Sequence, residues 1–137
     1  MGLQKEGRVQ EAILAYLGIV QRFPGDPRAY LSASQLMPRE QAIGLLEPAL
    51  VRMTEHTGLL NSLAVLYASK QRFDDALPLL SRAVQIEPEN PLSWLNLGVC
   101  LEAKGDRDGA SAAYRLTLTL DPGSSRGAAY LKRLSGR

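Results

Sequence analysis

The side chains most suited to catalysis in this sequence are its single histidine and its single cysteine, His56 and Cys100. A histidine can act as a general base and a cysteine thiolate as a nucleophile when each is held beside a suitable partner. His56 lies between two predicted helices, which favours a surface loop. Cys100 lies in an apolar stretch with nothing nearby that would lower the pKa of its thiol. We therefore predict no catalytic residue and interpret Cys100 as a small buried hydrophobic side chain.

Acidic residues gather at the predicted turns, where their carboxylates can accept hydrogen bonds from free backbone N–H groups at helix starts. They are Asp74, Asp75, Glu87, Glu89, Asp106 and Asp108. One cysteine allows neither an intramolecular disulfide nor a cysteine-based metal site. Gly105 and Gly109 stand alone and do not form a glycine-rich phosphate loop. We expect a protein that is not an enzyme and that holds neither a metal nor a cofactor.

The composition is that of an ordinary globular domain. The chain has 137 residues, of which 45% are hydrophobic and 22% charged, with a net charge of +2. This balance carries no electrostatic footprint for nucleic acid or for an anionic membrane. No apolar run approaches the roughly 18 residues of a membrane span, and the N-terminus lacks the apolar core of a secretory signal. We predict no nucleic-acid partner and no membrane insertion. The compartment stays undetermined, with a cytoplasmic location as the mild default.

Helical periodicity is clearest between Pro91 and Pro122. One stripe with spacings of three and four residues consists of Trp94, Leu97, Gly98 and Leu101. The turn residues Lys104, Gly105 and Asp106 interrupt this pattern. A second stripe consists of Ala110, Ala113, Tyr114 and Thr117. These stripes predict two amphipathic helices, neither of which can bury its apolar side alone.

The same plan recurs along the chain. Four columns of similar residues keep spacings of 30, 34 and 34 positions. They are Ala12, Ala42, Ala76 and Ala110; Tyr16, Leu46, Leu80 and Tyr114; Ile19, Ala49, Ala83 and Thr117; and Pro24, Thr54, Pro88 and Pro122. Small residues also recur in the first helices, where Ala64 and Gly98 lie 34 positions apart. Because a lone helix is weakened by glycine, Gly98 predicts a close helix crossing.

These columns make the chain similar to the tetratricopeptide repeat (TPR) family, whose unit of about 34 residues has the pattern W-x2-L-G-x2-Y…A-x3-F…P. Trp94, Leu97, Gly98, Ala110, Tyr114 and Pro122 match it, as do Leu60, Leu63, Ala64, Tyr67, Ala76, Leu80, Ala83 and Pro88 in the preceding unit. Leu101 departs from the usual tyrosine. The resemblance implies an all-α fold, a right-handed α-solenoid of antiparallel helix pairs.

We expect a single TPR domain over residues 1–137. Its parts are an unpaired second helix at 5–22, a shortened repeat at 27–56, complete repeats at 57–90 and 91–124, and a C-terminal capping helix at 125–137. The shortened repeat lacks four residues, about one helical turn, and predicts helices at 27–37 and 39–54. The capping helix should turn Ala128, Leu131 and Leu134 inward. The incomplete first unit favours a fragment of a larger protein.

A second stripe faces away from the Trp94–Leu101 seam. In TPR proteins the first helix of each unit lines a concave face, so the resemblance implies a groove for a peptide or helix. The predicted groove residues are Asn61, Val65, Leu92, Leu95, Asn96, Val99 and Arg126. An alternative for Leu95 and Val99 is packing on the adjacent first helix.

One group of TPR domains grips a C-terminal carboxylate with Lys, Arg and Asn at set groove positions. Asn96 and Arg126 match that pattern. Asn61, Val65 and Tyr130 stand where it requires Lys, Asn and Arg. This departure disfavours such a clamp.

The predicted function is a non-catalytic scaffold that binds a protein or peptide in the groove. The alternative is an assembly or oligomerisation segment of a larger protein, which could itself be an enzyme. It rests on the unpaired first helix, which would expose an apolar patch and allow self-association; the patch is Val9, Ile13, Tyr16 and Val20. A third hypothesis is RNA reading in the manner of pentatricopeptide repeats, which the near-neutral charge disfavours.

Overall fold

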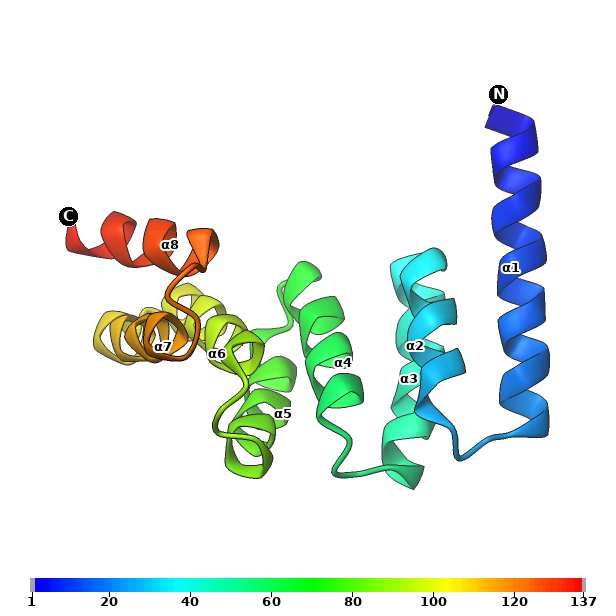
Figure 1. Cartoon of the computed structure of the whole chain (residues 1–137), viewed down its shortest axis with the longest axis horizontal. Helices are drawn as coiled ribbons and strands as arrows, with labels where there is room; N and C mark the ends of the chain where they lie inside the picture. Colours follow the sequence, from blue (N-terminus) through cyan, green and yellow to red (C-terminus); the bar gives the residue numbers. More distant parts are fainter. Residues whose placement is uncertain (1, 137) are drawn as a thin grey trace.

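The computed structural model describes residues 2–136, which contain eight α-helices and no strand (Figure 1). Met1 and Arg137, the two ends of the predicted domain, lie outside this range. The helices are α1 (Gly2–Arg22), α2 (Pro27–Leu36), α3 (Arg39–Arg52), α4 (Thr57–Ser69), α5 (Phe73–Ile86), α6 (Pro91–Ala103), α7 (Arg107–Leu120) and α8 (Ser125–Ser135). The helices predicted at 5–22, 27–37 and 39–54 are present, with ends that differ by at most three residues from the predicted ones.

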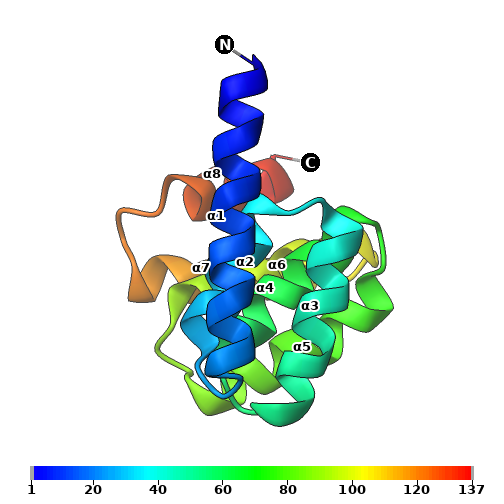
Figure 2. The same cartoon turned by 90° about the vertical axis from the view of Figure 1, so that its right-hand side faces the viewer.

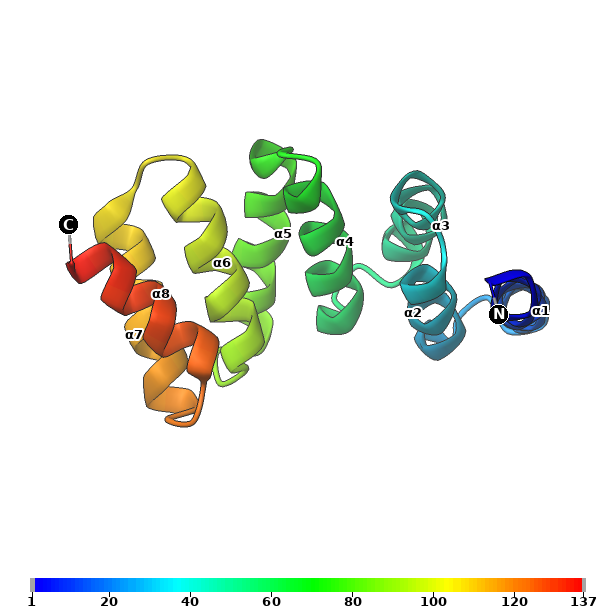
Figure 3. The ribbon, with the colours of Figure 1, turned by 90° about the horizontal axis from the view of Figure 1, so that it is seen from above.

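The helices form antiparallel pairs that follow one another in a right-handed α-solenoid, which confirms the predicted fold class. Each helix contacts the next in sequence, and α2 contacts α4, which in turn contacts α6. Figure 3 shows the pairs arranged along the long axis, with α1 at one end and α7 and α8 at the other. In Figure 2, α1 extends beyond the neighbouring helices. The first helices of successive units therefore lie side by side, as a continuous groove requires.

Within the last complete unit, Gly98 permits the close approach of α6 and α7. A Cβ atom at this position would lie 2.5 Å from Cε1 of Tyr114, whose side chain is fully buried. The Tyr114 hydroxyl donates a hydrogen bond to Oε1 of Glu102 at 2.8 Å. The close crossing predicted from Gly98 is therefore present, and the large tyrosine ring occupies the space that the missing side chain leaves.

The C-terminal helix covers the last unit. Leu134 of α8 packs in one buried cluster with Leu95, Ala110 and Tyr114. The prediction that Ala128 faces inward is wrong, because Ala128 is exposed while Gly127 is buried. The helix is rotated so that Gly127 lies against Thr117, where a Cβ atom would approach the Thr117 methyl group to 3.2 Å.

The first helix of every unit begins with a capping side chain. Asp26, His56, Asn90 and Ser124 each accept a hydrogen bond from a backbone N–H group in the first turn, at 3.0–3.1 Å. These caps keep the spacings of 30, 34 and 34 positions, so they form a further column of the repeat. His56 is thus the N-cap of α4, with its Nδ1 as the acceptor, and its role is structural.

The apolar surface of α1 differs from the predicted one. Ile13 is buried and Val20 packs against the main core, so neither contributes to an exposed patch. The prediction is wrong at these positions because α1 turns this side toward α2, which it contacts. The large exposed apolar side chains at this end are instead Leu14, Ile19 and Phe23.

Candidate functional site

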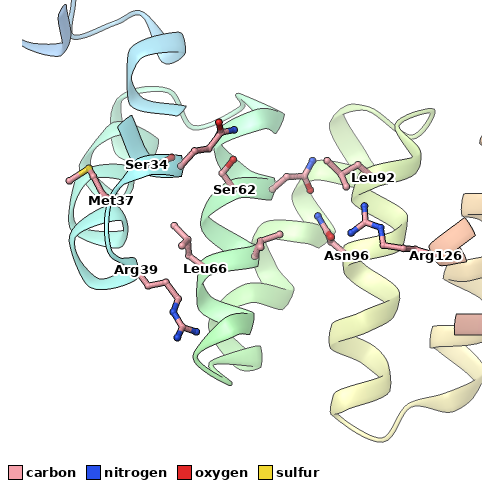
Figure 4. A pocket seen from close by; sticks show the side chains of 11 residues that line it. Ser34, Met37, Arg39, Ser62, Leu66, Leu92, Asn96 and Arg126 are labelled. Atoms are coloured by element: carbon pink, nitrogen blue, oxygen red, sulfur yellow. The ribbon is translucent and has the colours of Figure 1, made fainter. Parts of the chain in front are cut away.

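A groove runs across the first helices of successive units and encloses a cavity of about 470 Å³ (Figure 4). Helix α2 contributes Ser34 and Gln35, the turn after it contributes Met37, and Arg39 is the first residue of α3. Helix α4 contributes Asn61, Ser62, Val65 and Leu66. Leu92 and Asn96 come from α6, and Arg126 comes from the start of α8. Residues that are far apart in the sequence therefore share one wall because the repeat places their helices side by side.

Exposed aliphatic side chains form the apolar part of this surface. Val65 and Leu92 are 49% and 43% exposed, and both line the groove. A smaller cavity of about 180 Å³ adjoins it and shares Val65, Asn96 and Arg126 with it. Val99 lines this second cavity. The apolar strip thus continues along α6 beyond the main cavity.

Six of the seven predicted groove residues lie on this continuous surface, and Leu95 does not. Leu95 is only 4% exposed and belongs to the buried cluster with Tyr114 and Leu134. Its prediction as a groove residue is wrong, because the side chain points into the contact with α7 and α8. The alternative packing interpretation is correct for Leu95, whereas Val99 remains partly exposed.

Two asparagine amides with unpaired atoms lie at the floor of the groove. Asn61 is 4% exposed, and its Nδ2 donates a hydrogen bond to Oγ of Ser93 at 2.8 Å, which connects α4 to α6. Within residues 2–136, Oδ1 of Asn61 has no hydrogen-bond partner, and neither has Nδ2 of Asn96. Because buried polar groups in native proteins are nearly always paired, one unpaired acceptor and one unpaired donor on neighbouring helices require an explanation.

Among the described residues, the charged side chains that line the groove are both arginines, Arg39 and Arg126. Nη1 of Arg39 donates a hydrogen bond to the carbonyl oxygen of Ser69 at 3.0 Å. Arg126 is exposed and has no ion-pair or hydrogen-bond partner among the described residues. Figure 4 shows its guanidinium directed from α8 toward Asn96. The groove therefore has a positive electrostatic potential at this end.

The sequence reasoning missed groove-lining residues such as Ser34, Met37, Arg39 and Leu66, and it also missed Ser93, the hydrogen-bond partner of Asn61. Ser93 is fully buried and stands in a column with Ala29, Leu59 and Gly127, all of which are buried. A polar side chain in a column of buried small or apolar residues needs an internal partner. That signal could have identified Ser93, and with it the hydrogen bond to Asn61.

The residues considered as candidates for catalysis, such as Cys100 and Asp106, have structural roles. Cys100 is almost completely buried, and burial raises the pKa of its thiol to about 11, which disfavours the reactive thiolate. Asp106 accepts a hydrogen bond from the backbone N–H of Gly109 at 2.9 Å and so caps α7.

Residues 2–136 contain no group of three or more His, Cys, Asp or Glu side chains that could hold a metal ion. In the same range, no helix has the length and apolar character that crossing a membrane requires.

Comparison with known proteins extends these observations. Two family models, both described as tetratricopeptide repeat, match residues 39–91 and 67–134. A crystal structure of MamA is 20% identical with a TM-score of 0.83, and the match covers 97% of this chain and 80% of that one. The first TPR domain of human RPAP3 is 17% identical with a TM-score of 0.67, and the match covers 86% of this chain and 89% of that one. The Arabidopsis OM64 TPR domain is 20% identical with a TM-score of 0.69, and the match covers 72% of this chain and 82% of that one. No curated protein matches in sequence.

Proposed function

The chain belongs to the tetratricopeptide repeat family, whose members are generally non-catalytic scaffolds for protein–protein interaction, and we propose that it binds a peptide segment of a partner protein in the groove. The observation that carries this proposal is the continuous surface formed by Val65, Leu92, Asn96 and Arg126. It combines exposed aliphatic side chains with hydrogen-bonding groups, the combination that preformed ligand sites use for affinity and orientation.

A peptide fits this surface better than a small molecule does. The main cavity is long because it crosses successive helices from the end of α2 to the start of α8. Val65 and Leu92 leave apolar area in contact with water, and covering it with the side chains of a partner is favourable. Backbone groups of the partner can use the serines and asparagines beside them.

The test is a double variant, Val65→Glu with Asn96→Ala, assayed with peptides of 12 residues selected from an unbiased displayed library on the wild-type protein. We expect wild-type binding in fluorescence polarisation and at least a tenfold loss in the variant, because a charge is placed in the apolar strip. Both positions tolerate the change, since Val65 is exposed and Nδ2 of Asn96 has no partner to lose.

The matched control is Val51→Glu, which makes the same change at an exposed valine of α3 outside the groove. It should bind as the wild type does, and circular dichroism should show unchanged helicity in all variants. Equal affinity of the double variant and the wild type for every selected peptide would exclude the groove as the binding site.

Assembly through α1 is a second candidate function. It is favoured by comparing the burial of equivalent repeat positions in α7 and α1. In α7 the side chains of Ala113, Tyr114 and Thr117 are buried between neighbouring first helices. The equivalent positions of α1 are less covered, and Ile19 is exposed together with Leu14 and Phe23. An amphipathic helix from a second copy could cover this side. Light scattering at increasing concentration tests it: the wild type should form dimers and an Ile19→Glu variant should stay monomeric, whereas a strictly monomeric wild type would exclude self-association.

A further inference from the structure

We infer that α1 packs antiparallel against α1 of a second copy of this chain, with Tyr16 of one copy lying over Gly18 of the other. This inference rests on the proposed assembly through α1 and adds the register and the two sides of the contact. It is drawn from two sets of residues on α1 that carry the two halves of a helix contact already present between α6 and α7.

The first half of the contact is the column formed by Ala12, Tyr16 and Ile19. In α3, α5 and α7 each residue of this column is no more than 2% exposed, because the first helix of the same unit covers it. In α1, Ala12 and Tyr16 are half-buried and Ile19 is 41% exposed. Among the described helices, α2 is the main neighbour of α1, which forms one end of the stack (Figure 3). This column therefore keeps apolar surface that a further helix can cover.

The middle residue of the column determines which helix can cover it. In α7 this residue is Tyr114, and a Cβ atom added at Gly98 of α6 would lie 2.5 Å from its Cε1. Where the middle residue is leucine, in α3 and α5, the place of Gly98 is taken by Ser34 and Ala64. Helix α1 has Tyr16 in the middle and so resembles α7. The helix that covers it needs a glycine opposite the tyrosine ring.

The second half of the contact lies on the other side of the same helix. Leu14, Leu17 and Gly18 have the spacing of Trp94, Leu97 and Gly98, so α1 carries the first-helix motif in addition to the second-helix column. Leu14 is 67% exposed, and a Cβ atom added at Gly18 would meet no side chain within 4 Å apart from those next to it in sequence. The space above Gly18 is open, whereas a buried tyrosine ring fills the space above Gly98. Because both halves occur on one helix, a second copy supplies what the first requires.

The contact between α6 and α7 also provides the register. Placing Tyr16 opposite Gly18 of the second copy aligns residues 12–22 of one helix with residues 22–12 of the other, an overlap of about three turns. In this register Leu14 of the second copy lies near Ile19 of the first. Two large apolar side chains that are exposed in the single chain are thus covered together.

The two copies use different sides of the helix. Each residue advances about 100° around the axis, so Tyr16 and Gly18 are separated by about 200°, and one neighbour cannot contact both. The interface is therefore heterologous, with the tyrosine side of one copy against the glycine side of the other. A single helix pair buries less area than a standard interface, so we expect weak association with a Kd on the order of 100 µM.

The variant that tests this contact is Gly18→Leu, which places a side chain where the ring of Tyr16 should lie. In sedimentation equilibrium its Kd for self-association should be at least tenfold higher than that of the wild type. The monomer tolerates the change, because the space is open and leucine favours a helix more than glycine does, so its thermal stability should be equal or higher. A leucine exposed on α1 with no role in a contact would instead leave association unchanged or strengthen it.

The matched control is Gly7→Leu, the same change at another glycine of α1 with open surroundings. In the inferred register Gly7 lies opposite a position beyond Arg22, where α1 ends. This variant should therefore associate as the wild type does.

A mixture of two variants tests the heterologous arrangement. Gly18→Leu retains the tyrosine side, and Ile19→Glu retains the glycine side. Each variant alone should stay monomeric at concentrations where the wild type forms dimers, whereas their equimolar mixture should form dimers. Failure of the mixture to associate would overturn the heterologous arrangement, because a contact that uses the same side in both copies cannot be restored in this way.

The outcomes separate this inference from the proposed functions. Association of Gly18→Leu at the wild-type Kd, with Ile19→Glu still monomeric, would overturn the contact between Tyr16 and Gly18 and leave assembly through another arrangement of α1. A strictly monomeric wild type would remove both. Peptide binding in the groove is tested by different variants and stands or falls independently of these results.

Discussion

Asn61 in α4 and Leu95 in α6 occupy the same position in successive repeats, 34 residues apart, and are equally buried. Leu95 packs in an apolar cluster with Ala110, Tyr114 and Leu134. Asn61 instead donates a hydrogen bond to Ser93 and keeps an unpaired oxygen. One repeat position thus makes an apolar contact near the C-terminal end of the stack and a polar contact in its middle.

This difference means that Asn61 contributes less to the free energy of unfolding than the equivalent Leu95 does. A leucine in a buried cluster contributes the full free energy of removing its apolar surface from water. A buried amide must offset its desolvation free energy through hydrogen bonds, and Asn61 does so only in part. The polar contact lies beside the groove, and the apolar one lies behind α8. Variants of Leu95 and Ser93 exchange or remove the features that distinguish the two contacts, and the caps of α4 and α6 offer a further comparison of the same two helices.

The largest effect is expected for Leu95→Asn, which imposes the polar side chain of the middle contact on the apolar one. We expect a loss of about 3–5 kcal/mol in the free energy of unfolding, because apolar contacts vanish and amide atoms are buried without partners. Urea denaturation measures it. Val99→Asn, on the same helix at a partly exposed position, should change stability by no more than about 0.5 kcal/mol. Equal losses in both variants would contradict the assignment of Leu95 to the core.

A smaller effect is expected for Ser93→Ala, which removes the acceptor of the Asn61 amide. The free energy of unfolding should fall by about 1–3 kcal/mol, because Nδ2 of Asn61 then lies buried without a partner. Ser81→Ala, at an exposed serine of α5, serves as the control. Adding Asn61→Leu to Ser93→Ala should recover part of the loss, since the unpaired group is removed. No recovery would mean that the two side chains are not coupled.

The smallest effect concerns the helix starts, where His56 caps α4 and Asn90 caps α6. His56→Ala should lower the free energy of unfolding by about 1 kcal/mol, because the backbone N–H of Leu59 loses its acceptor. His56→Asn gives α4 the cap that α6 already has and should retain most of the wild-type stability. Thermal denaturation followed by circular dichroism can resolve both. A larger loss for His56→Asn than for His56→Ala would show that the imidazole acts in another way.

The repeat made most of the fold predictable. Columns with constant spacing located every helix, and Gly98 indicated the close crossing that Tyr114 fills. The same columns placed Asn61, Val65, Asn96 and most of the other groove residues on one surface. The fold prediction is confirmed because helical periodicity determines which side chains share a face of a helix.

Periodicity failed where the identity of the covering helix mattered. Leu95 and Leu92 belong to the same predicted stripe, yet α8 covers Leu95 and leaves Leu92 exposed. Ile13 and Val20 likewise share an apolar face that α2 covers in part. A stripe spans a wide arc of the helix surface, and only the packing of the neighbouring helices divides it into covered and open portions.

By itself, the sequence determined the repeat length, the helix pairs and their family, because glycine, proline and apolar residues act locally and recur at fixed intervals. Only the tertiary structure decided that Asn61 meets Ser93, that Arg126 reaches the groove from α8 without a partner among the described residues, and that Leu95 is core. The reason is that these relations join side chains of different units, whose distances depend on the angles at which successive pairs stack.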